Sequence, residues 1–397
     1  LYEKAEPLLI ESLKLSKKVL GPEHPKTAMA FTKLGSLYID QALYNKAESH
    51  YLKALEIEEK VYGENSYLLG DRLNDLGVLY LDKGLFKKSE TFLLRALSLL
   101  DESTDSNNPS LEVTLYNLGA VNYDIGMSIK AEKYFLRAIK ITENNLGNEH
   151  LDISRSLQFL GMIYMDQGLY DKAETLLKRS LSISEKYFGS ENTQTATNLN
   201  NLGLLYLEKG FHKKAKPLFF KALDIDEKNY GTFHPFVSIA SSNLALLYED
   251  QSFYYEGEPF ARKTLEIDFT LIQRDAPYLA LSERQLFSES FGNTYERAFS
   301  YAWHGEKGKK LALFSRLNKQ GLLEEIEKRQ AKLAMLPGPQ KIVSEKLREL
   351  TQKISSKDLS IEERKKLKKQ KNNLERKLYR LLPELKPRLV SVSEVAE

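Results

Sequence analysis

The stretch Leu199-Asn200-Asn201-Leu202-Gly203-Leu204-Leu205-Tyr206 decides the fold, because its pattern returns every 42 residues along the chain. Its glycine is taken here as position 0 of the repeat. That position holds, in order, Gly35, Gly77, Gly119, Gly161, Gly203 and finally Ala245. A strict period of this length predicts a stack of similar units, in which each unit buries its apolar face only against its neighbours. Such a stack presents a long surface, so we expect function to lie in binding.

Residues of fixed size surround the glycine in each repeat. Leucine precedes it, tyrosine usually follows at +3, and small residues at +12 and +19 flank a bulky one at +16. In the fifth repeat these four are Tyr206, Ala215, Phe219 and Ala222. Small residues let two helix backbones approach, and bulky ones fill the space beside them. The pattern therefore predicts two packed helices, A and B, in every repeat.

These offsets resemble the tetratricopeptide signature, in which Leu, Gly, Tyr, Ala, an aromatic residue and Ala recur at the same spacings. The ordinary repeat has about 34 residues. The longer form seen here, with turns such as Gly21-Pro22-Glu23-His24-Pro25, resembles the repeat of kinesin light chains, which bacterial proteins share. The resemblance covers residues 1–272 and implies an all-α fold, a right-handed tetratricopeptide superhelix.

The expected array, residues 1–272, consists of an orphan B helix at 2–19 and six repeats, the last degenerate. We expect A helices at 26–41, 68–83, 110–125, 152–167, 194–209 and 236–251. We expect B helices at 44–61, 86–102, 128–145, 170–187, 212–229 and 254–271. In the sixth repeat Gly257 and Thr264 replace the usual residues, and Pro259 is expected to interrupt helix B.

A helical linker is expected over residues 273–337, beginning with Ser282-Glu283-Arg284-Gln285. A basic turn at Gly305 and Gly308 should lead into a long helix at 309–335, which Pro337-Gly338-Pro339 ends.

A basic antiparallel helical hairpin and tail are expected over residues 338–397. Apolar residues at coiled-coil spacing form its two seams, with a turn at 355–360 where Ser360 and Glu363 would make a capping box. The seam residues are Val343, Leu347, Leu350 and Ile354 in the first helix and Leu367, Leu374 and Leu378 in the second.

The order of these pieces resembles the linker that joins repeat arrays to CHAT domains, the caspase-like peptidases of bacteria. The cues are the Ser282–Gln285 helix, the Arg316–Gly321 stretch and the end of the hairpin at Leu381-Leu382-Pro383. The resemblance implies a peptidase domain beyond Glu397. The chain also opens at Leu1 within a repeat, so we expect a piece of a longer protein.

Composition limits the alternatives. The chain of 397 residues has no cysteine, which excludes disulfides and a cysteine nucleophile within it. No apolar run is long enough to cross a bilayer and no signal peptide is present, which suits a soluble, cytoplasmic protein. Residues 305–397 hold 24 Lys and Arg against 13 Asp and Glu, whereas residues 1–304 hold 34 against 42. The basic end could therefore contact nucleic acid, an anionic surface or the acidic array itself.

The inner wall of tetratricopeptide arrays is formed by the A helices, and the resemblance places position −3 there. That position holds Thr32, Asn74, Tyr116, Gln158, Asn200 and Ser242. Asn74 and Asn200 match the kinesin-light-chain asparagines that hold extended peptides, because a side-chain amide both donates and accepts hydrogen bonds. The alternative is that these residues are simply solvated. Asparagines at −2, such as Asn117 and Asn243, are expected to bond within their own repeat.

Acidic residues at +5 and lysines at +11 form two further rows. We expect them to pair across the turn between helices A and B; the alternative is an acidic ladder that binds a basic ligand. The sixth repeat has Glu256 in place of the lysine, which makes Asp250 a candidate for an external partner. The loop histidines His24, His150 and His234 are expected to cap turns and not to bind metal.

The sequence thus favours a non-enzymatic scaffold that binds a peptide or partner protein in the groove of the array, without cofactor or metal. In the intact molecule it would serve as the regulatory arm of a CHAT-type peptidase. The alternative is nucleic-acid or anionic-surface binding through the basic hairpin. The lysines of that hairpin lack interleaved aromatic residues, which argues against nucleic acid.

Overall fold

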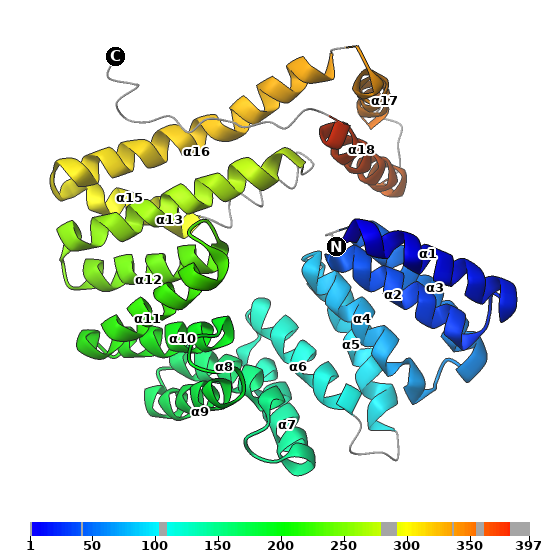
Figure 1. Cartoon of the computed structure of the whole chain (residues 1–397), viewed down its shortest axis with the longest axis horizontal. Coiled ribbons are helices and arrows are strands. Elements are labelled where there is room, and N and C mark those ends of the chain that lie inside the picture. The colour runs from blue at the N-terminus through cyan, green and yellow to red at the C-terminus, as the bar shows by residue number, and fades with distance from the viewer. Residues whose placement is uncertain are drawn as a thin grey trace. The chain divides into compact units, whose positions relative to one another are not determined.

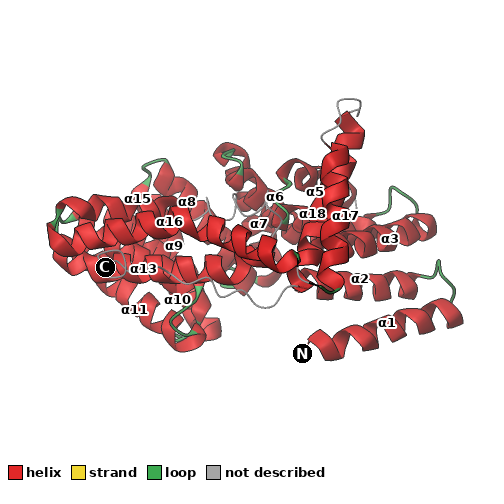
Figure 2. Cartoon of the chain, turned by 90° about the horizontal axis from the view of Figure 1, so that it is seen from above, coloured by secondary structure: helices red, strands yellow, loops and turns green. Residues whose placement is uncertain are grey.

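The computed structural model describes residues 2–40, 43–102, 109–278, 292–335, 337–354 and 361–381. Every regular element within these ranges is an α-helix or a short 3-10 helix (Figures 1 and 2). The chain divides into two compact halves, Leu1–Ser190 and Glu191–Glu397. The expected all-α repeat fold is confirmed. Within the described ranges, no helix combines the length and apolarity needed to cross a lipid bilayer.

The N-terminal half begins with α1 (Tyr2–Val19), the orphan B helix, and continues as four helix pairs. The pairs are α2 (Pro25–Asp40) with α3 (Tyr44–Tyr62), α4 (Gly70–Asp82) with α5 (Phe86–Asp101), α6 (Pro109–Asp124) with α7 (Ser128–Leu146), and α8 (Leu151–Asp166) with α9 (Tyr170–Phe188). A 3-10 turn, η1 (Tyr67–Leu69), precedes α4. The expected helices are confirmed to within two residues at each end.

The C-terminal half contains two more regular pairs and a divergent helical end. The regular pairs are α10 (Thr193–Glu208) with α11 (His212–Tyr230) and α12 (Pro235–Asp250) with α13 (Tyr254–Asp275). The divergent end comprises η2 (Ala276–Tyr278), α15 (Gly292–Ser300), η3 (Tyr301–Trp303), α16 (Gly305–Ala334), α17 (Pro339–Ile354) and α18 (Ile361–Leu381).

Close helix crossings explain the glycine at position 0. A Cβ atom placed on Gly203 would lie 2.6 Å from the Phe219 ring, and one on Gly77 would lie 2.5 Å from Leu93. Both partners are fully buried residues at +16. The expected fit of a small residue on helix A against a bulky one on helix B is therefore confirmed, and it sets how closely the two helices of a pair approach.

The turn between helices A and B requires a left-handed residue at +7. Gly210 adopts φ +70° there, and the sixth repeat forces the same conformation on Ser252, with φ 60°.

Histidines cap the start of several A helices. At the start of α2, the backbone N–H of Lys26 donates to Nδ1 of His24 at 3.1 Å. His150 and His234 accept equivalent bonds, so the expected turn-capping role of these histidines is confirmed.

Neighbouring repeats of the N-terminal half are joined by a recurring bond between tyrosine and glutamate. The +3 tyrosine hydroxyl donates at 2.9 Å to a glutamate of the preceding B helix, 32 residues earlier. The pairs are Tyr38 with Glu6, Tyr80 with Glu48, and Tyr164 with Glu132. Burial, and to a smaller extent the bond to Glu6, raises the pKa of Tyr38 to about 12.

The expected pairing of +11 lysines with +5 acids is wrong. The ammonium of Lys88 lies 4.9 Å from the centroid of the Tyr80 ring, and Lys172 lies 5.5 Å from that of Tyr164. Position +11 is in the first turn of helix B, above the face of the tyrosine of its own repeat, where a cation is attracted to the ring. Burial without a basic partner raises the pKa of Asp82, one of the +5 acids.

Helix α13 passes through Pro259 without a break, so the expected interruption is also wrong. Pro217 stands at the equivalent place in α11. Both prolines are exposed and lie in the second turn. The residues whose carbonyls lose a backbone donor, Lys213 and Tyr255, are exposed as well, which limits the cost of the missing hydrogen bond.

The helices after α13 close the end of the C-terminal half. Tyr295, Tyr301 and Leu311 pack against Phe269 of α13 in one buried cluster. Helix α16 starts at Gly305, which has φ +89°, so Gly305 and Gly308 lie in its first turn and the helix begins four residues earlier than expected. The helix ends just before Pro337-Gly338-Pro339, as expected.

Helices α17 and α18 form the expected hairpin (Figure 2). Val343 and Leu347 near the start of α17 pack with Leu374 and Leu378 near the end of α18, which makes the pair antiparallel. Several expectations fall outside the described residues: the Ser282–Gln285 helix, the turn and capping box at 355–360, and the segment that follows Leu381.

Candidate functional site

Two asparagine pairs connect successive A helices at positions −3 and −2. In the N-terminal half, Nδ2 of Asn117 on α6 donates to Oδ1 of Asn74 on α4 at 2.9 Å. In the C-terminal half, Nδ2 of Asn243 on α12 donates to Oδ1 of Asn200 on α10 at 3.3 Å. We call these two contacts the amide pairs. They correct the expectation that −2 asparagines bond within their own repeat, because the −2 residue faces the A helix before it.

Each amide pair keeps unused hydrogen-bonding capacity. The contact between Asn74 and Asn117 consumes one N–H and one carbonyl, which leaves the Nδ2 group of Asn74 and the Oδ1 atom of Asn117. Neither atom is among the fully buried polar atoms that lack a partner in the described residues, so both remain accessible to solvent. The same holds for Nδ2 of Asn200 and Oδ1 of Asn243. Each pair therefore keeps one donor group and one acceptor that the described residues do not use.

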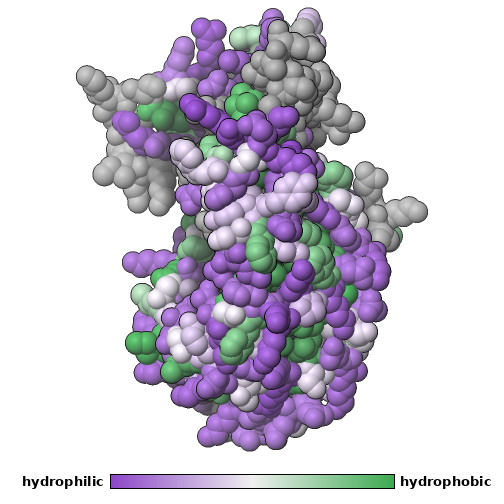
Figure 3. Space-filling model, turned by 90° about the vertical axis from the view of Figure 1, so that its left-hand side faces the viewer, coloured by the Kyte–Doolittle hydropathy of each residue, from purple (hydrophilic) through white to green (hydrophobic). Residues whose placement is uncertain are grey.

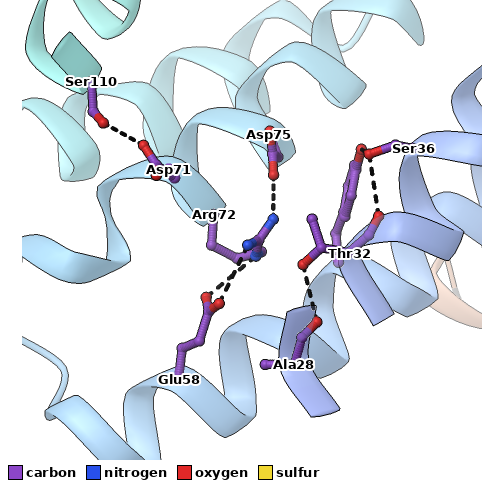
Figure 4. Close-up of polar contacts among 9 residues, drawn as sticks. Ala28, Thr32, Ser36, Glu58, Asp71, Arg72, Asp75 and Ser110 are labelled. Atoms are coloured by element: carbon purple, nitrogen blue, oxygen red, sulfur yellow. Dashed lines mark hydrogen bonds and ion pairs between the residues drawn. The ribbon is translucent and has the colours of Figure 1, made fainter. Parts of the chain in front are cut away.

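Thr32 occupies position −3 on α2, but its hydroxyl donates to the carbonyl of Ala28 at 3.1 Å (Figure 4). The neighbouring −2 residue on α4 is Asp75. Arg72 lies between Asp75 and Glu58 of α3, with Nε of Arg72 3.3 Å from the Glu58 carboxylate. Burial outweighs the attraction of Arg72 and raises the pKa of Asp75 to about 6. No amide pair therefore joins α2 to α4, because Thr32 bonds within α2 and Asp75 belongs to a charge network between α4 and α3.

Tyr116 and Gln158 occupy position −3 on α6 and α8. Tyr116 is half-buried, with its ring centroid 6.0 Å from that of Phe159. Gln158 is 7% exposed, and its Nε2 has no hydrogen-bond partner among the described residues. The six −3 residues therefore lie on successive A helices but differ in surroundings.

Ser242 is already covered by the chain itself. Arg297 of α15 donates to the backbone carbonyl of Ser242 at 2.9 Å and also contacts its hydroxyl. The Arg297 guanidinium lies 3.6 Å from the Glu249 carboxylate, which stabilises the contact. Asp250, at the end of α12, is half-exposed, and its carboxylate lies 2.5 Å from Nε2 of His212 on α11. Both candidates on α12 therefore have partners within the C-terminal half.

The surface of the protein is mixed in character. On the face shown in Figure 3, hydrophobic side chains lie in small groups among hydrophilic ones. Arginines on the B helices pair with acids of the preceding B helix, such as Arg95 with Glu59 at 2.7 Å and Arg179 with Glu143 at 2.7 Å. These ion pairs hold adjacent repeats together.

Models of the tetratricopeptide repeat match residues 1–57, 29–102, 152–228 and 194–268, and a second form of the model matches residues 113–145. The chain belongs to the tetratricopeptide repeat family. The matched residues cover more than half of the chain and nearly all of the expected array. No curated protein matches the sequence.

Solved structures are similar to this chain at low sequence identity. BtubC (BKLC) from P. vanneervenii is 21% identical, with 59% of this chain and 92% of that chain covered and a TM-score of 0.51. A Rap protein complexed with competence and sporulation factor is 17% identical, with 82% and 87% covered and a TM-score of 0.51. The repeats of a putative kinesin light chain from Podosopora anserina are 19% identical, with 52% and 98% covered and a TM-score of 0.45.

Sequence reasoning named Asn117 and Asn243 but gave them the wrong partners, and it missed Arg297, which covers Ser242. A signal for the correct partners of the two asparagines was present. Asparagines at −3 and at the next −2 are 43 residues apart, one more than the repeat, in both amide pairs. Arg297 gave no such signal, because it lies 55 residues after Ser242 and outside the period.

Proposed function

We propose that this tetratricopeptide protein is an interaction scaffold that binds an extended peptide, or an extended segment of a partner protein, along its A helices. The observation that supports the proposal is the unused donor and acceptor on each amide pair. Every residue of an extended peptide carries one backbone N–H and one backbone carbonyl. The Asn74 and Asn117 pair of the N-terminal half can therefore bond one backbone unit of such a ligand, and the Asn200 and Asn243 pair offers an equivalent site in the C-terminal half.

The family and its known structures agree with this role. The Rap protein with a similar fold was solved with competence and sporulation factor bound. In the N-terminal half we place the central contact at Asn74, with Thr32, Tyr116 and Gln158 as flanking positions. In the C-terminal half we place it at Asn200. Ser242 and Asp250 already have intramolecular partners, so a ligand would reach them only by displacing Arg297 or His212.

Peptide-array binding to the purified chain tests this proposal. We expect the double variant Asn74→Ala and Asn200→Ala to weaken binding of selected peptides about tenfold, because two hydrogen-bonding sites are lost. Asn144→Ala is the matched control, since Asn144 is an exposed asparagine on helix α7. Full affinity in the double variant would contradict the placement of the site. Failure of the unmodified chain to select any peptide would contradict the function.

We also propose that the array is the regulatory arm of a larger CHAT-type peptidase. Residues 1–272 would recognise the ligand, residues 273–337 would act as linker, and the hairpin over 338–397 would lead to the catalytic domain. The support is the resemblance of the linker together with the order of α15, α16 and the α17–α18 hairpin. Reading the coding sequence beyond Glu397 tests this. A caspase-like fold with its His and Cys would support the proposal, and any other domain would contradict it.

A second candidate function is binding of nucleic acid through α18. Lys366, Lys368 and Lys369 are exposed on that helix, which supports it. Binding should weaken with salt, and replacing the three lysines by glutamine should reduce the salt dependence by about one phosphate contact per lysine involved. The control replaces Lys87, Lys133 and Lys140, which are exposed on B helices. Equal binding by both triple variants would exclude this candidate.

A further inference from the structure

The turns between helices A and B change character in the C-terminal half. Position +8, just before helix B, is Leu or Met in the first four repeats but phenylalanine in the last two, at Phe211 and Phe253. Both side chains are exposed. At +13, five of the six repeats have glutamate, whereas the fifth has Lys216. Packing alone would keep the repeated residue, so departures that gather in one place point to a local function.

Lys216 replaces a residue that joins successive repeats elsewhere. The glutamate at +13 accepts the tyrosine hydroxyl of the next repeat, as Glu48 does from Tyr80. Lys216 is exposed, and its ammonium lies 5.0 Å from the centroid of the Tyr248 ring in the next repeat. The change therefore gives up a hydrogen bond between repeats and turns a negative charge at this turn into a positive one.

A third turn of similar composition lies beside these two. Between η3 and α16 the chain reads Trp303-His304-Gly305-Glu306-Lys307-Gly308-Lys309-Lys310. The His304 ring stacks on Tyr254 at the start of α13, with centroids 3.4 Å apart and planes 5° apart. The ammonium of Lys307 lies 4.6 Å from the centroid of the Tyr255 ring. Helices α13 and α16 thus begin at the same edge of the C-terminal half (Figure 1).

The three turns form one edge, which we call the basic aromatic edge and define as residues 209–216, 251–258 and 303–310. The contact between His212 and Asp250 joins the first turn to the second. The edge holds seven lysines against three acids. The equivalent turns of the N-terminal half hold six lysines against five acids, counted over residues 41–48, 83–90, 125–132 and 167–174. Net positive charge is therefore concentrated at the turns of the C-terminal half.

Large aromatic side chains are exposed in each turn of the basic aromatic edge. Trp303, the one tryptophan of the chain, is 89% exposed, and Tyr255 is 72% exposed. Phe211 and Phe253 are half-exposed. The aromatic residues of the equivalent N-terminal turns are more buried, namely Tyr44, Phe86 and Tyr170. Exposed apolar surface of this extent is typical of an interaction site, because a partner would remove it from water.

Buried contacts hold the turn that carries Trp303. Tyr301 is fully buried, and its hydroxyl donates to the backbone carbonyl of Ala245 at 3.0 Å. Gly308 approaches the Tyr301 carbonyl so closely that a Cβ atom there would clash with it. The backbone around Trp303 is therefore fixed while the indole is exposed, so little order would be lost when the indole binds a partner.

We propose that the basic aromatic edge binds the surface of an anionic lipid membrane, with Trp303 and Tyr255 at the level of the headgroups. Tryptophan and tyrosine favour the membrane–water interface, because their rings are apolar and each carries a polar group. Each lysine near an anionic leaflet adds electrostatic attraction. The inference goes beyond peptide binding along the A helices and does not depend on it.

Two other partners fit this edge less well. Lysine is depleted in protein–protein interfaces, whereas here lysines accompany the exposed rings. Lys209 and Lys214 lie 5.4 and 5.1 Å from the centroid of the Phe211 ring, and Lys307 lies over Tyr255. Bases of single-stranded nucleic acid stack on open ring faces, and these lysines occupy them. At a membrane, lysine stems can lie along the rings while their ammonium groups reach the headgroups.

Because Trp303 is the one tryptophan, its fluorescence tests the proposal directly. Vesicles of phosphatidylserine mixed with phosphatidylcholine are added to the full chain, and vesicles of phosphatidylcholine alone serve as the neutral comparison. We expect the anionic vesicles to shift the emission to shorter wavelength and to protect the indole from acrylamide. Absence of binding would overturn the proposal. Sedimentation with anionic vesicles while the emission stays unchanged would also overturn it, because the contact would then lie elsewhere.

Lysine variants give the magnitude of the electrostatic part. Replacing Lys307, Lys309 and Lys310 together by glutamine should weaken binding to anionic vesicles at least tenfold, because each exposed lysine contributes attraction. The matched control replaces the exposed B-helix lysines Lys87, Lys133 and Lys140 by glutamine and should bind as the full chain does. Equal weakening by both triple variants would contradict the placement of the contact.

An aromatic variant measures the part that salt does not screen. Trp303→Ala should weaken binding severalfold at low and at high salt alike, whereas the loss from the lysine variant should shrink as salt rises. Phe233→Ala, which changes an exposed aromatic residue before α12, is the control and should have no effect. Unchanged vesicle binding by Trp303→Ala, measured by sedimentation, would contradict a role for the indole.

A single-stranded oligonucleotide separates the membrane from nucleic acid. Quenching of Trp303 by the oligonucleotide, without any response to anionic vesicles, would overturn the proposal in favour of nucleic acid. The peptide-array assay is independent of these measurements. Loss of vesicle binding in the lysine variant with peptide selection intact would support two separate surfaces.

Discussion

Asn117 on α6 donates its side-chain amide to Asn74 on α4 at 2.9 Å, across the boundary between two repeats. Both residues lie on the proposed binding face, so the contact affects stability as well as recognition. We expect Asn117→Ala and Asn74→Ala each to lower the free energy of unfolding by about 1 kcal/mol. The double variant should cost less than the sum by about 0.5 kcal/mol or more, because the two changes remove one shared bond.

Urea unfolding of the four proteins in this cycle measures the coupling. Asn144→Ala provides the baseline and should lie within about 0.5 kcal/mol of the unmodified chain. Strictly additive costs would mean that the two asparagines act independently.

The contact between Gly203 and Phe219 predicts the effect of a single methyl group. Gly203→Ala places a Cβ atom 2.6 Å from the Phe219 ring, which is fully buried and cannot move away freely. The variant should lose about 1–3 kcal/mol of unfolding free energy through overpacking. Adding Phe219→Leu should make Gly203→Ala less costly than it is with Phe219 in place. Equal costs in both backgrounds, measured by chemical denaturation, would argue against this explanation of the glycine.

Among the described residues, Ser252 is the non-glycine residue with a positive φ, which is 60°. It occupies repeat position +7, where other repeats have glycine. Its left-handed conformation costs about 1–2 kcal/mol for a residue with a Cβ atom, and glycine recovers part of that after its own entropy loss. Ser252→Gly should therefore stabilise the chain by about 0.5–1 kcal/mol. The reciprocal change, Gly210→Ser, should destabilise it by a similar amount. Thermal unfolding of both variants checks the sign, and a destabilised Ser252→Gly would refute the argument.

Asp268 on α13 makes the stability of the C-terminal half depend on pH. Its carboxylate accepts hydrogen bonds from Ser238 of α12 and from Thr294 of α15, the latter at 2.7 Å. Burial nevertheless raises its pKa from 3.8 to about 6, the hydrogen bonds opposing that rise. The folded chain therefore binds more protons than the unfolded chain between about pH 4 and 6, so this residue lowers stability as the pH rises through that window and has no further effect above it.

Asp268→Asn should remove this dependence. The unfolding free energy of the variant relative to the unmodified chain should rise from pH 4 to pH 6 by up to about 3 kcal/mol, at about 1.4 kcal/mol per pKa unit. Asp224→Asn, which changes an exposed acid on α11, serves as the control. An unchanged difference across the window would show that Asp268 does not titrate there.

The helix pairs could be read from the sequence because their determinants are local and periodic. Gly203 and Phe219 are 16 residues apart, and the same combination of small and bulky residues recurs in each regular repeat. The histidine caps could also be predicted from the sequence, since His150 caps the helix that begins at the next residue. The continuity of α13 could not be predicted, because the cost of Pro259 depends on whether the carbonyl four residues before it is accessible to water.

The sequence by itself determined an array of αα repeats and the face on which to seek a ligand, because side chains at fixed offsets along a helix share a face and each repeat packs against its neighbours. Only the tertiary structure decided which side chains meet across helices. It paired Asn74 with Asn117, placed Lys88 over the Tyr80 ring and covered Ser242 with Arg297. Such contacts depend on how adjacent helices are offset and crossed, and periodicity along one chain does not specify that offset.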